Sequence, residues 1–289
     1  MATLEGRLNI DGMQIQALND PQNFDPALPT LVLLNGLATS VDHWGEFPQH
    51  LEVPAVAIDA TRSTQLGRNP YFPFLSFLPS IPSLHPYANQ VARGITEITE
   101  GGGQVDLGGY SFGGILAQLV ALKYPELIRR QVLIATAPFA QCGSPEMLAL
   151  IGFGNHDRSS ERFLQKAGDM YGGDLRTHPE LVSSRGIARE TNIFSYWHQV
   201  GAVIMSSLEG NFFRVHNIEQ PTLVIASDDD PLLPKENAYM LEKLLPNVIL
   251  EMIEGGGHAF VMTRPEETAM IVNPFLLKSL NNEKLALVA

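Results

Sequence analysis

Short apolar runs alternate with longer, helix-like stretches along most of this chain. The runs at residues 30–34, 55–58 and 104–107 are too short and too uniformly apolar to be surface helices. The alternation returns in the last quarter of the chain, with runs at 221–226 and 248–253. Such a rhythm is typical of a parallel sheet whose strands are joined by crossover helices. The sequence therefore predicts an α/β fold with a mostly parallel central sheet flanked by helices.

Turn and helix signals place the other elements. An Asp-Gly pair, which supplies the positive φ angles of a tight turn, separates two short runs near the N-terminus and predicts a hairpin. Pro125 ends a helical pattern, because proline cannot continue a helix. The expected elements are the hairpin at 8–18, a strand at 131–135, and helices at 113–124, 235–245 and 265–279.

The alternation stops between residues 138 and 220. Aromatic and methionine side chains recur there at helical spacing, and the stretch contains no convincing strand. We interpret it as a helical insertion. The expected organisation is a core made of residues 1–137 and 221–289, with residues 138–220 forming a helical lid over it.

A second segment, residues 69–86, interleaves prolines with aromatic and aliphatic side chains. Proline removes a backbone donor, so this density of proline argues against a helix or an inner strand. The apolar side chains either pack over another surface from an extended loop or form an exposed contact patch, and Phe74 and Phe77 are candidate substrate contacts. The prolines are Pro70, Pro73, Pro79, Pro82 and Pro86.

Charge and cysteine content exclude several classes of function. The formal net charge is −12, which disfavours nucleic acid and anionic membrane surfaces as partners. The single cysteine, Cys142, allows no internal disulfide, and no cysteine or histidine cluster predicts a zinc site or another metal site. No secretory signal and no apolar run of membrane-spanning length is visible. We therefore expect a cytoplasmic protein without integral membrane association.

The motif Gly109-Tyr110-Ser111-Phe112-Gly113 is the strongest chemical signal. It has the form GxSxG and stands directly between a predicted strand and a predicted helix. A nucleophile elbow has this setting, because its turn is too tight for side chains at the flanking positions. We identify Ser111 as the candidate nucleophile.

A serine hydroxyl needs a base, and the base needs an acid to orient it. His258 follows a strand in a glycine-rich loop, at the sheet edge where the elbow lies. Three acids follow the preceding strand. Asp230 stands where the chain turns toward the next helix, so we choose it as the acid, and Asp228 and Asp229 are the alternatives that would instead solvate or cap the loop.

The oxyanion of an acyl-transfer intermediate requires two backbone N–H groups. One is expected from Phe112, which follows the nucleophile, and the other from Leu37 in the loop after the first central strand. Asn35 in that loop either braces it by side-chain hydrogen bonds or simply forms a turn. Asn35, Tyr110 and Trp197 are further candidate substrate contacts.

Elbow, oxyanion loop, Asp loop and His loop occur here in the order of the α/β-hydrolases. More narrowly, the chain resembles the intracellular medium-chain-length poly(3-hydroxyalkanoate) depolymerases. The resemblance lies in Leu33-Leu34-Asn35-Gly36, Met170-Tyr171-Gly172-Gly173, Tyr196-Trp197-His198-Gln199 and the stretches 178–181, 220–224, 228–234 and 257–264. The chain departs from this family at Phe112, where a Trp is expected, and at residues 69–86, where a short turn is expected.

The resemblance implies hydrolysis of hydrophobic hydroxyacyl esters through a Ser-His-Asp triad without any cofactor. Its expected partners are an ester or polyester substrate and the surface of a polymer granule. The alternatives are a small-molecule carboxylesterase or lactonase, an acyltransferase that passes the hydroxyacyl group to an alcohol, and a non-enzymatic ligand sensor. Acyl-chain length and oligomeric state do not follow from the sequence.

Overall fold

A computed structural model describes residues 7–10, 13–37, 39, 41–60, 82–139, 161–181 and 193–278. Their strands form one eight-stranded sheet in the order β1-β2-β4-β3-β5-β6-β7-β8. The first two strands run antiparallel to their neighbours, and the other pairings are parallel. The strands are β1 (Arg7–Ile10), β2 (Met13–Ala17), β3 (Leu31–Leu34), β4 (Ala55–Asp59), β5 (Val105–Tyr110), β6 (Ile128–Ile134), β7 (Thr222–Ser227) and β8 (Val248–Ile253).

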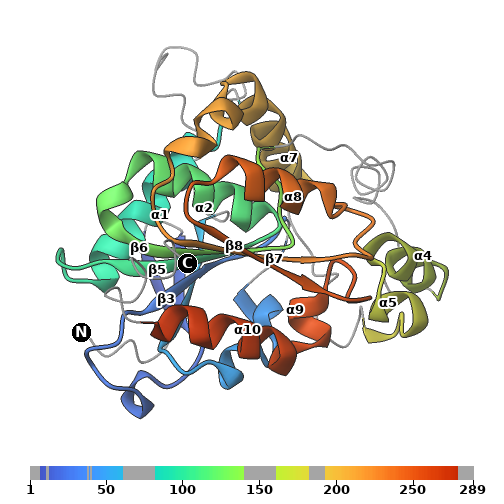
Figure 1. Ribbon diagram of the computed structural model, residues 1–289, viewed down its shortest axis with the longest axis horizontal. Coiled ribbons are helices and arrows are strands. Elements are labelled where there is room, and N and C mark those ends of the chain that lie inside the picture. The colour runs from blue at the N-terminus through green and yellow to red at the C-terminus, as the bar shows by residue number, and fades with distance from the viewer. Residues whose placement is uncertain are drawn as a thin grey trace, which may run out of the picture.

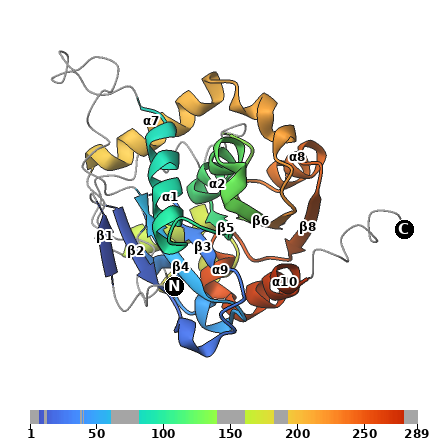
Figure 2. The ribbon, with the colours of Figure 1, turned by 90° about the vertical axis from the view of Figure 1, so that its left-hand side faces the viewer.

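Helices cover both faces of this sheet (Figure 1). Helices α1, α2 and α8 lie on one face, and α9 and α10 lie on the other (Figure 2). The predicted α/β architecture with a mostly parallel sheet is thereby confirmed. The helices are α1 (His85–Ile98), α2 (Phe112–Lys123), α4 (Glu161–Tyr171), α5 (Asp174–Thr177), α7 (Ile193–Leu208), α8 (Glu236–Leu244), α9 (Phe260–Thr263) and α10 (Pro265–Leu277). Short 3-10 helices are η1 (Pro21–Asn23), η2 (Val41–Trp44), η3 (Phe47–His50), η7 (Pro125–Leu127) and η9 (Asn211–Asn217).

The uniformly apolar runs are explained by burial on both sides. In β3, Val32 and Leu34 pack against the helices of one face, while Leu31 and Leu33 pack against those of the other. Successive side chains of a strand point to opposite faces, so a doubly covered strand needs apolar residues throughout. β8 lies at the edge of the sheet and alternates between exposed and partly buried positions instead.

One expectation for residues 69–86 is wrong. Pro86 was counted among the prolines that argue against a helix, but it lies in the first turn of α1. At that position the missing N–H has no partner to lose, and the fixed φ angle suits the helix. Residues 61–81, which include Phe74 and Phe77, lie outside the described residues.

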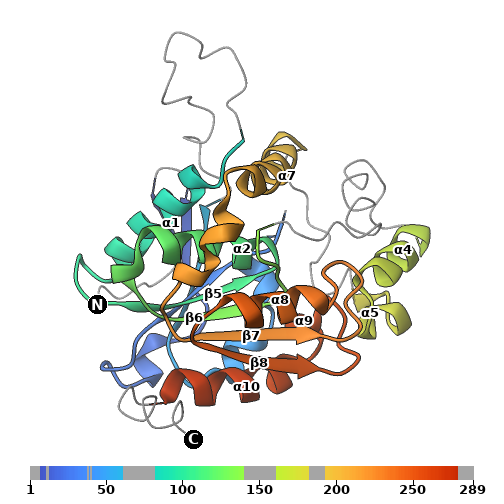
Figure 3. The same ribbon diagram turned by 45° about the horizontal axis from the view of Figure 1, so that its top comes forward.

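The predicted insertion contains helices wherever the structure describes it. Between β6 and β7 these are α4, α5, α7 and η9, with no strand in residues 161–181 and 193–217. α4 and α5 lie beyond the ends of β7 and β8, and α7 lies above α2 (Figure 3). The division into a core and a lid stays a prediction. In the described part of the chain, no helix is long and apolar enough to cross a membrane.

Candidate active site

Ser111 occupies the turn between β5 and α2. Its backbone has φ 52° and ψ −117°, a conformation that L-residues rarely adopt. The Ser111 N–H donates to the Ile134 carbonyl (2.9 Å), and the Ser111 carbonyl accepts from Thr136 Oγ1 (2.7 Å) and from the N–H groups of Gly114 (2.9 Å) and Ile115 (3.3 Å). The end of β6 and the residues that directly follow it therefore hold the strained residue on both its N–H and its carbonyl side.

The glycines beside Ser111 allow backbone to approach backbone. A Cβ at Gly109 would lie 2.2 Å from the Gly113 carbonyl oxygen, and a Cβ at Gly113 would lie 2.1 Å from the Leu34 carbonyl oxygen. Both distances are far below van der Waals contact, so no side chain fits at either position. The glycines of the GxSxG motif thus have the steric role that the sequence predicts.

Ser111, His258 and Asp230 form one chain of hydrogen bonds. His258 Nε2 lies 3.1 Å from Ser111 Oγ, and His258 Nδ1 lies 2.7 Å from Asp230 Oδ2. The other carboxylate oxygen of Asp230 accepts the N–H groups of Leu232 and Leu233, each at 2.9 Å. His258 and Asp230 are both buried. The Asp230 carboxylate is thus oriented by backbone donors on one oxygen and by imidazole on the other.

The two other aspartates of the triplet have partners elsewhere. Asp228 Oδ1 accepts the N–H of Gly255 (2.7 Å), which lies in the His loop, residues 254–258. Asp229 Oδ2 accepts the Gly173 N–H (3.1 Å) and pairs with Arg176 Nη1 (2.9 Å). Of the three acids, the structure brings Asp230 to the histidine.

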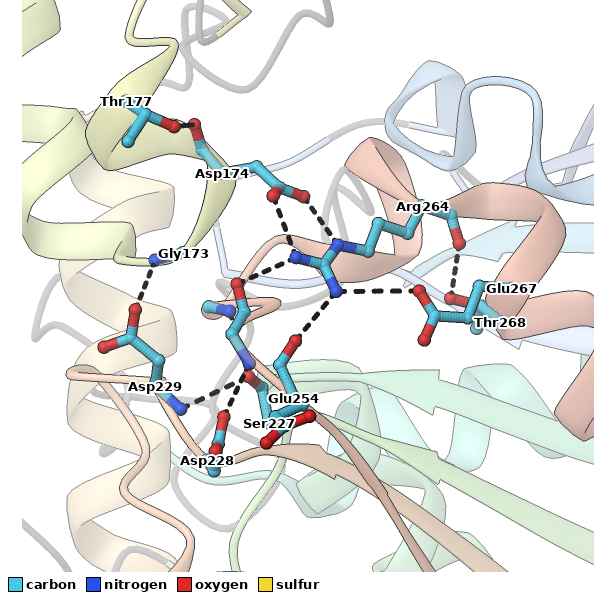
Figure 4. Close-up of polar contacts among 12 residues, drawn as sticks. Gly173, Asp174, Thr177, Ser227, Asp228, Asp229, Glu254, Arg264, Glu267 and Thr268 are labelled. Carbon is cyan, nitrogen blue, oxygen red and sulfur yellow. Dashed lines mark hydrogen bonds and ion pairs between the residues drawn. The ribbon is translucent and has the colours of Figure 1, made fainter.

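The loop before His258 is held by the segment between α4 and α5. The His258 N–H donates to the Tyr171 carbonyl (2.6 Å), and the Gly257 N–H donates to Ser227 Oγ (2.9 Å). Figure 4 shows Ser227 between Asp228, Asp229 and this loop. We call residues 171–174, which end α4 and begin α5, the α4–α5 turn. Its contact with the backbone of His258 was not predicted, although the Gly-Gly pair at 172–173 was the signal available in the sequence.

Glycines of the α4–α5 turn and of the His loop are in close contact. A Cβ at Gly173 would lie 2.3 Å from the carbonyl carbon of Gly256, and a Cβ at Gly257 would lie 2.5 Å from the carbonyl carbon of Gly172. Gly172, Gly173 and Gly257 also have positive φ angles, which favour glycine. The two segments therefore meet backbone to backbone.

The predicted oxyanion donors come from two segments next to Ser111. Phe112 begins α2 directly after Ser111, and Leu37 follows Gly36, where an added Cβ would lie 3.6 Å from Ser111 Cβ. The Phe112 ring is buried and stands edge-on to Tyr87, with ring centroids 6.1 Å apart. The loop that carries Leu37 therefore lies next to the elbow that contains Ser111.

Asn35 braces the loop that carries Leu37. Its Oδ1 accepts a hydrogen bond from Trp44 Nε1 at 2.8 Å, and its side chain is buried. Of the two alternatives for Asn35, bracing is the one that the structure has. A buried asparagine in this position fixes the path of the loop past Ser111, and contact with substrate stays a prediction.

Aromatic side chains surround the His258 imidazole. Tyr110 and Tyr171 approach it with ring centroids at 5.2 Å and 5.9 Å, and His43 lies 5.2 Å from the Tyr110 ring. Burial, with a smaller contribution from nearby His258, lowers the pKa of His43 to about 3. Burial, together with the neighbouring Tyr171 and Asp230, raises the pKa of Tyr110 well above its ordinary value. Both side chains are therefore neutral near pH 7.

In the sequence, His43 stands beside Trp44 with no matching acid-bearing loop, so nothing there marks it as part of the site. Its approach to Tyr110 arises only in the folded chain. Trp197 lies in α7, and its side chain is outside the described part, as are Phe74 and Phe77. Within the residues that the structure describes, no group of three or more His, Cys, Asp or Glu side chains could hold a metal ion.

Comparison with known proteins gives the family. The sequence pattern of the alpha/beta hydrolase family matches residues 31–271. This chain belongs to the alpha/beta hydrolase family. The hydrolase is 32% identical over 260 residues to poly(3-hydroxyalkanoate) depolymerase of Ectopseudomonas oleovorans, covering 87% of this chain and 85% of that one. The predicted resemblance is confirmed at this level.

Solved structures of low sequence identity share the fold of this hydrolase. A lipase-esterase related protein from Clostridium acetobutylicum matches with a TM-score of 0.68 at 20% identity, over 91% of this chain and 99% of that one. A meta-cleavage product hydrolase from Pseudomonas fluorescens matches with a TM-score of 0.68 at 16% identity, over 95% of this chain and 98% of that one.

Proposed function

We propose that this hydrolase is a serine esterase that works through Ser111, His258 and Asp230. The observation that carries the proposal is the continuous hydrogen-bond chain from Ser111 Oγ through both imidazole nitrogens to a buried carboxylate. This is the geometry that activates a serine hydroxyl near neutral pH.

Each group then has a defined step. His258 Nε2 takes the proton of Ser111 while Oγ attacks the ester carbonyl, and Asp230 stabilises the imidazolium that forms. The N–H groups of Phe112 and Leu37 bind the oxyanion of the tetrahedral intermediate. The intermediate expels the alcohol, which receives the proton from His258. Water, deprotonated by the same imidazole, hydrolyses the acyl-enzyme and returns Ser111 to its starting state.

The finer part of the proposal concerns the substrate. We infer a hydrophobic hydroxyacyl ester, with poly(3-hydroxyalkanoate) as the polymeric form and the granule surface as its place of action. Its support is the relative of 32% identity that bears this name, together with the buried aromatic surroundings of the site.

Two measurements, made one after the other, test the proposal. A fluorophosphonate should label wild-type protein at Ser111 and should not label Ser111→Ala, since labelling needs an activated oxygen. Labelling that persists in Ser111→Ala contradicts the nucleophile.

Release of 3-hydroxy acids is then compared among amorphous medium-chain polyester granules, short-chain polyester and p-nitrophenyl esters under identical conditions. Faster turnover of the medium-chain polymer supports the polyester substrate. Activity on p-nitrophenyl esters alone supports the small-molecule carboxylesterase instead.

A further inference from the structure

Arg264 connects the α4–α5 turn with the His loop. Its Nε and Nη2 atoms donate to the two carboxylate oxygens of Asp174, at 2.9 Å and 3.0 Å. Its Nη1 and Nη2 atoms also donate to the carbonyls of Glu254 and Gly255, at 2.8 Å and 3.1 Å (Figure 4). One guanidinium therefore fastens the turn and the start of the His loop to the beginning of α10.

Asp229 fastens the same turn from the other side. Its carboxylate accepts the Gly173 N–H and pairs with Arg176, the third residue of α5. Asp229 stands next to Asp230 in the chain, so this contact connects the turn with the acid loop. The α4–α5 turn is thus held against both loops that supply the histidine and its acid.

The α4–α5 turn also holds the backbone of His258. The Tyr171 carbonyl accepts the His258 N–H at 2.6 Å, and the glycines of the two segments are in direct backbone contact. No flexible side chain lies between these backbones, so nothing there can absorb a displacement of the turn. A shift of the turn would therefore move the His258 backbone.

The charge state of the pair suits a permanent link. Burial raises the pKa of the Asp174 carboxyl, but the hydrogen bonds from Arg264 and the Arg264 charge outweigh it, and the pKa lies below its ordinary value. The same partner raises the pKa of Arg264. The ion pair is thus present throughout the pH range in which a serine esterase works.

We propose that Asp174 and Arg264 are positioning residues, which act through the α4–α5 turn to hold His258 within hydrogen-bond distance of Ser111. The inference rests on the proposed function, since it assigns His258 as the base. Both side chains are 28% exposed, and partly exposed ion pairs contribute little to stability. By contrast, misplacing a reacting group by about 1 Å reduces a rate by roughly 100-fold.

The experiment compares Asp174→Asn with Glu267→Gln. Glu267 is a matched control because it is also an acidic partner of Arg264, at 3.6 Å from Nη1, but it lies on α10 with Arg264 and does not touch the turn. Both substitutions remove one negative charge beside the same guanidinium. Only Asp174→Asn breaks the bidentate contact with the turn.

Two rates are measured for each variant: turnover of p-nitrophenyl butyrate and second-order labelling of Ser111 by a fluorophosphonate. For Asp174→Asn we expect kcat and the labelling rate to fall by about 10- to 100-fold, with KM changed by less than about twofold. Glu267→Gln should stay within about twofold of wild type in both rates. Arg264→Lys keeps the charge but loses the planar fork, so its losses should be intermediate.

Rates are expressed per folded molecule, from circular dichroism at the assay temperature. If Asp174→Asn and Glu267→Gln have equal labelling rates on this basis, the positioning role is overturned. A loss that disappears after this normalisation also overturns it, since the pair would then only stabilise the fold. Wild-type protein that is not labelled contradicts the proposed function itself, which is a distinguishable result.

Discussion

Ser111 holds a backbone conformation that costs free energy. Non-glycine residues in sparsely populated regions of φ and ψ cost on the order of 1–3 kcal/mol each. The hydrogen bonds from Ile134 and Thr136 and the close packing of the flanking glycines offset this cost. In this conformation the Ser111 hydroxyl lies within hydrogen-bond distance of His258.

Replacing Ser111 should separate these two effects. Ser111→Ala and Ser111→Gly should both lose esterase activity, since neither has a nucleophile. The glycine variant should be more stable to urea than the alanine variant, by about 1 kcal/mol, because glycine adopts φ 52° without a Cβ clash. Equal unfolding free energies for the two variants would contradict the strain.

The aspartate triplet gives a graded prediction. Asp230→Asn should lower kcat by roughly 10⁴-fold, as loss of the triad carboxylate does in a serine protease. Asp228→Asn is the matched control, because it removes the same charge two residues away and keeps a side-chain oxygen that can accept the Gly255 N–H. It should retain activity within a few-fold. A larger loss at Asp228 than at Asp230 would move the acid role.

His43 should make folding sensitive to acid. The unfolded chain binds a proton at His43 below pH 6.5, whereas the folded chain does not bind it until about pH 3. The stability that depends on neutral His43 is therefore fully present above pH 6.5. It falls as the pH drops from 6.5 toward 3, by at most about 1.4 kcal/mol per pH unit.

His43→Leu should remove that part of the pH dependence. Urea unfolding at pH 7.5, 6 and 5 should show a smaller loss of unfolding free energy for the variant than for wild type. Parallel curves for the two proteins would mean that His43 does not titrate in this range.

The candidate active-site residues could be predicted from the sequence because motif and position agree. Ser111 stands in a GxSxG turn, and Asp230 and His258 each follow a strand, so parallel topology alone predicts that they meet at one sheet edge. His43 and the Tyr171 carbonyl carry no such signal. A backbone acceptor has no side-chain identity, and His43 reaches the site only through tertiary packing.

Among the secondary elements, the errors have local causes. β6 begins at Ile128 rather than near residue 131. Arg129 and Arg130 interrupt the apolar run, so its first three residues do not look like part of a buried strand. β5 continues to Tyr110, so the first two of the five residues of the GxSxG motif belong to the strand. The sequence analysis predicts no helix at α1. Prolines precede this helix and lie in its first turn, and proline elsewhere ends a helix.

A partly buried hydrogen bond links α1 with α7. Tyr87 Oη lies 2.7 Å from His198 Nδ1, and burial raises the pKa of Tyr87, which therefore keeps its proton. Tyr87→Phe keeps the ring that packs on Phe112 and removes the hydroxyl. The variant should lose about 1 kcal/mol of unfolding free energy in urea. The control Tyr239→Phe, on the exposed face of α8, should lose none.

Hydrogen bonds connect the central sheet to the last helix of the described chain. Arg130 is fully buried in β6 and donates to the carbonyls of Phe275, Leu276 and Lys278 at the C-terminal end of α10. Helix ends leave their last carbonyls without partners inside the helix. Arg129 Nη2 also donates to the Leu276 carbonyl, at 2.9 Å, so two adjacent arginines of β6 satisfy the end of α10.

Arg130→Met should destabilise the entire molecule by roughly 2–4 kcal/mol, because those carbonyls lose charged donors. Thermal or urea unfolding measures the loss, and exposed Lys243→Met controls for the removal of a positive charge. An Arg130→Met protein as stable as the control would show that water replaces the guanidinium without cost.

The glycine contact between the α4–α5 turn and the His loop has an evolutionary consequence. Mutational tolerance usually depends on compensation, in which one side chain shrinks when its neighbour grows. Here neither partner has a side chain to shrink, so a substitution at Gly173 or Gly257 has no second-site suppressor across the contact. Laboratory evolution of this hydrolase should therefore leave these glycines unchanged in every active clone, while exposed positions such as Leu208 and Phe213 vary freely.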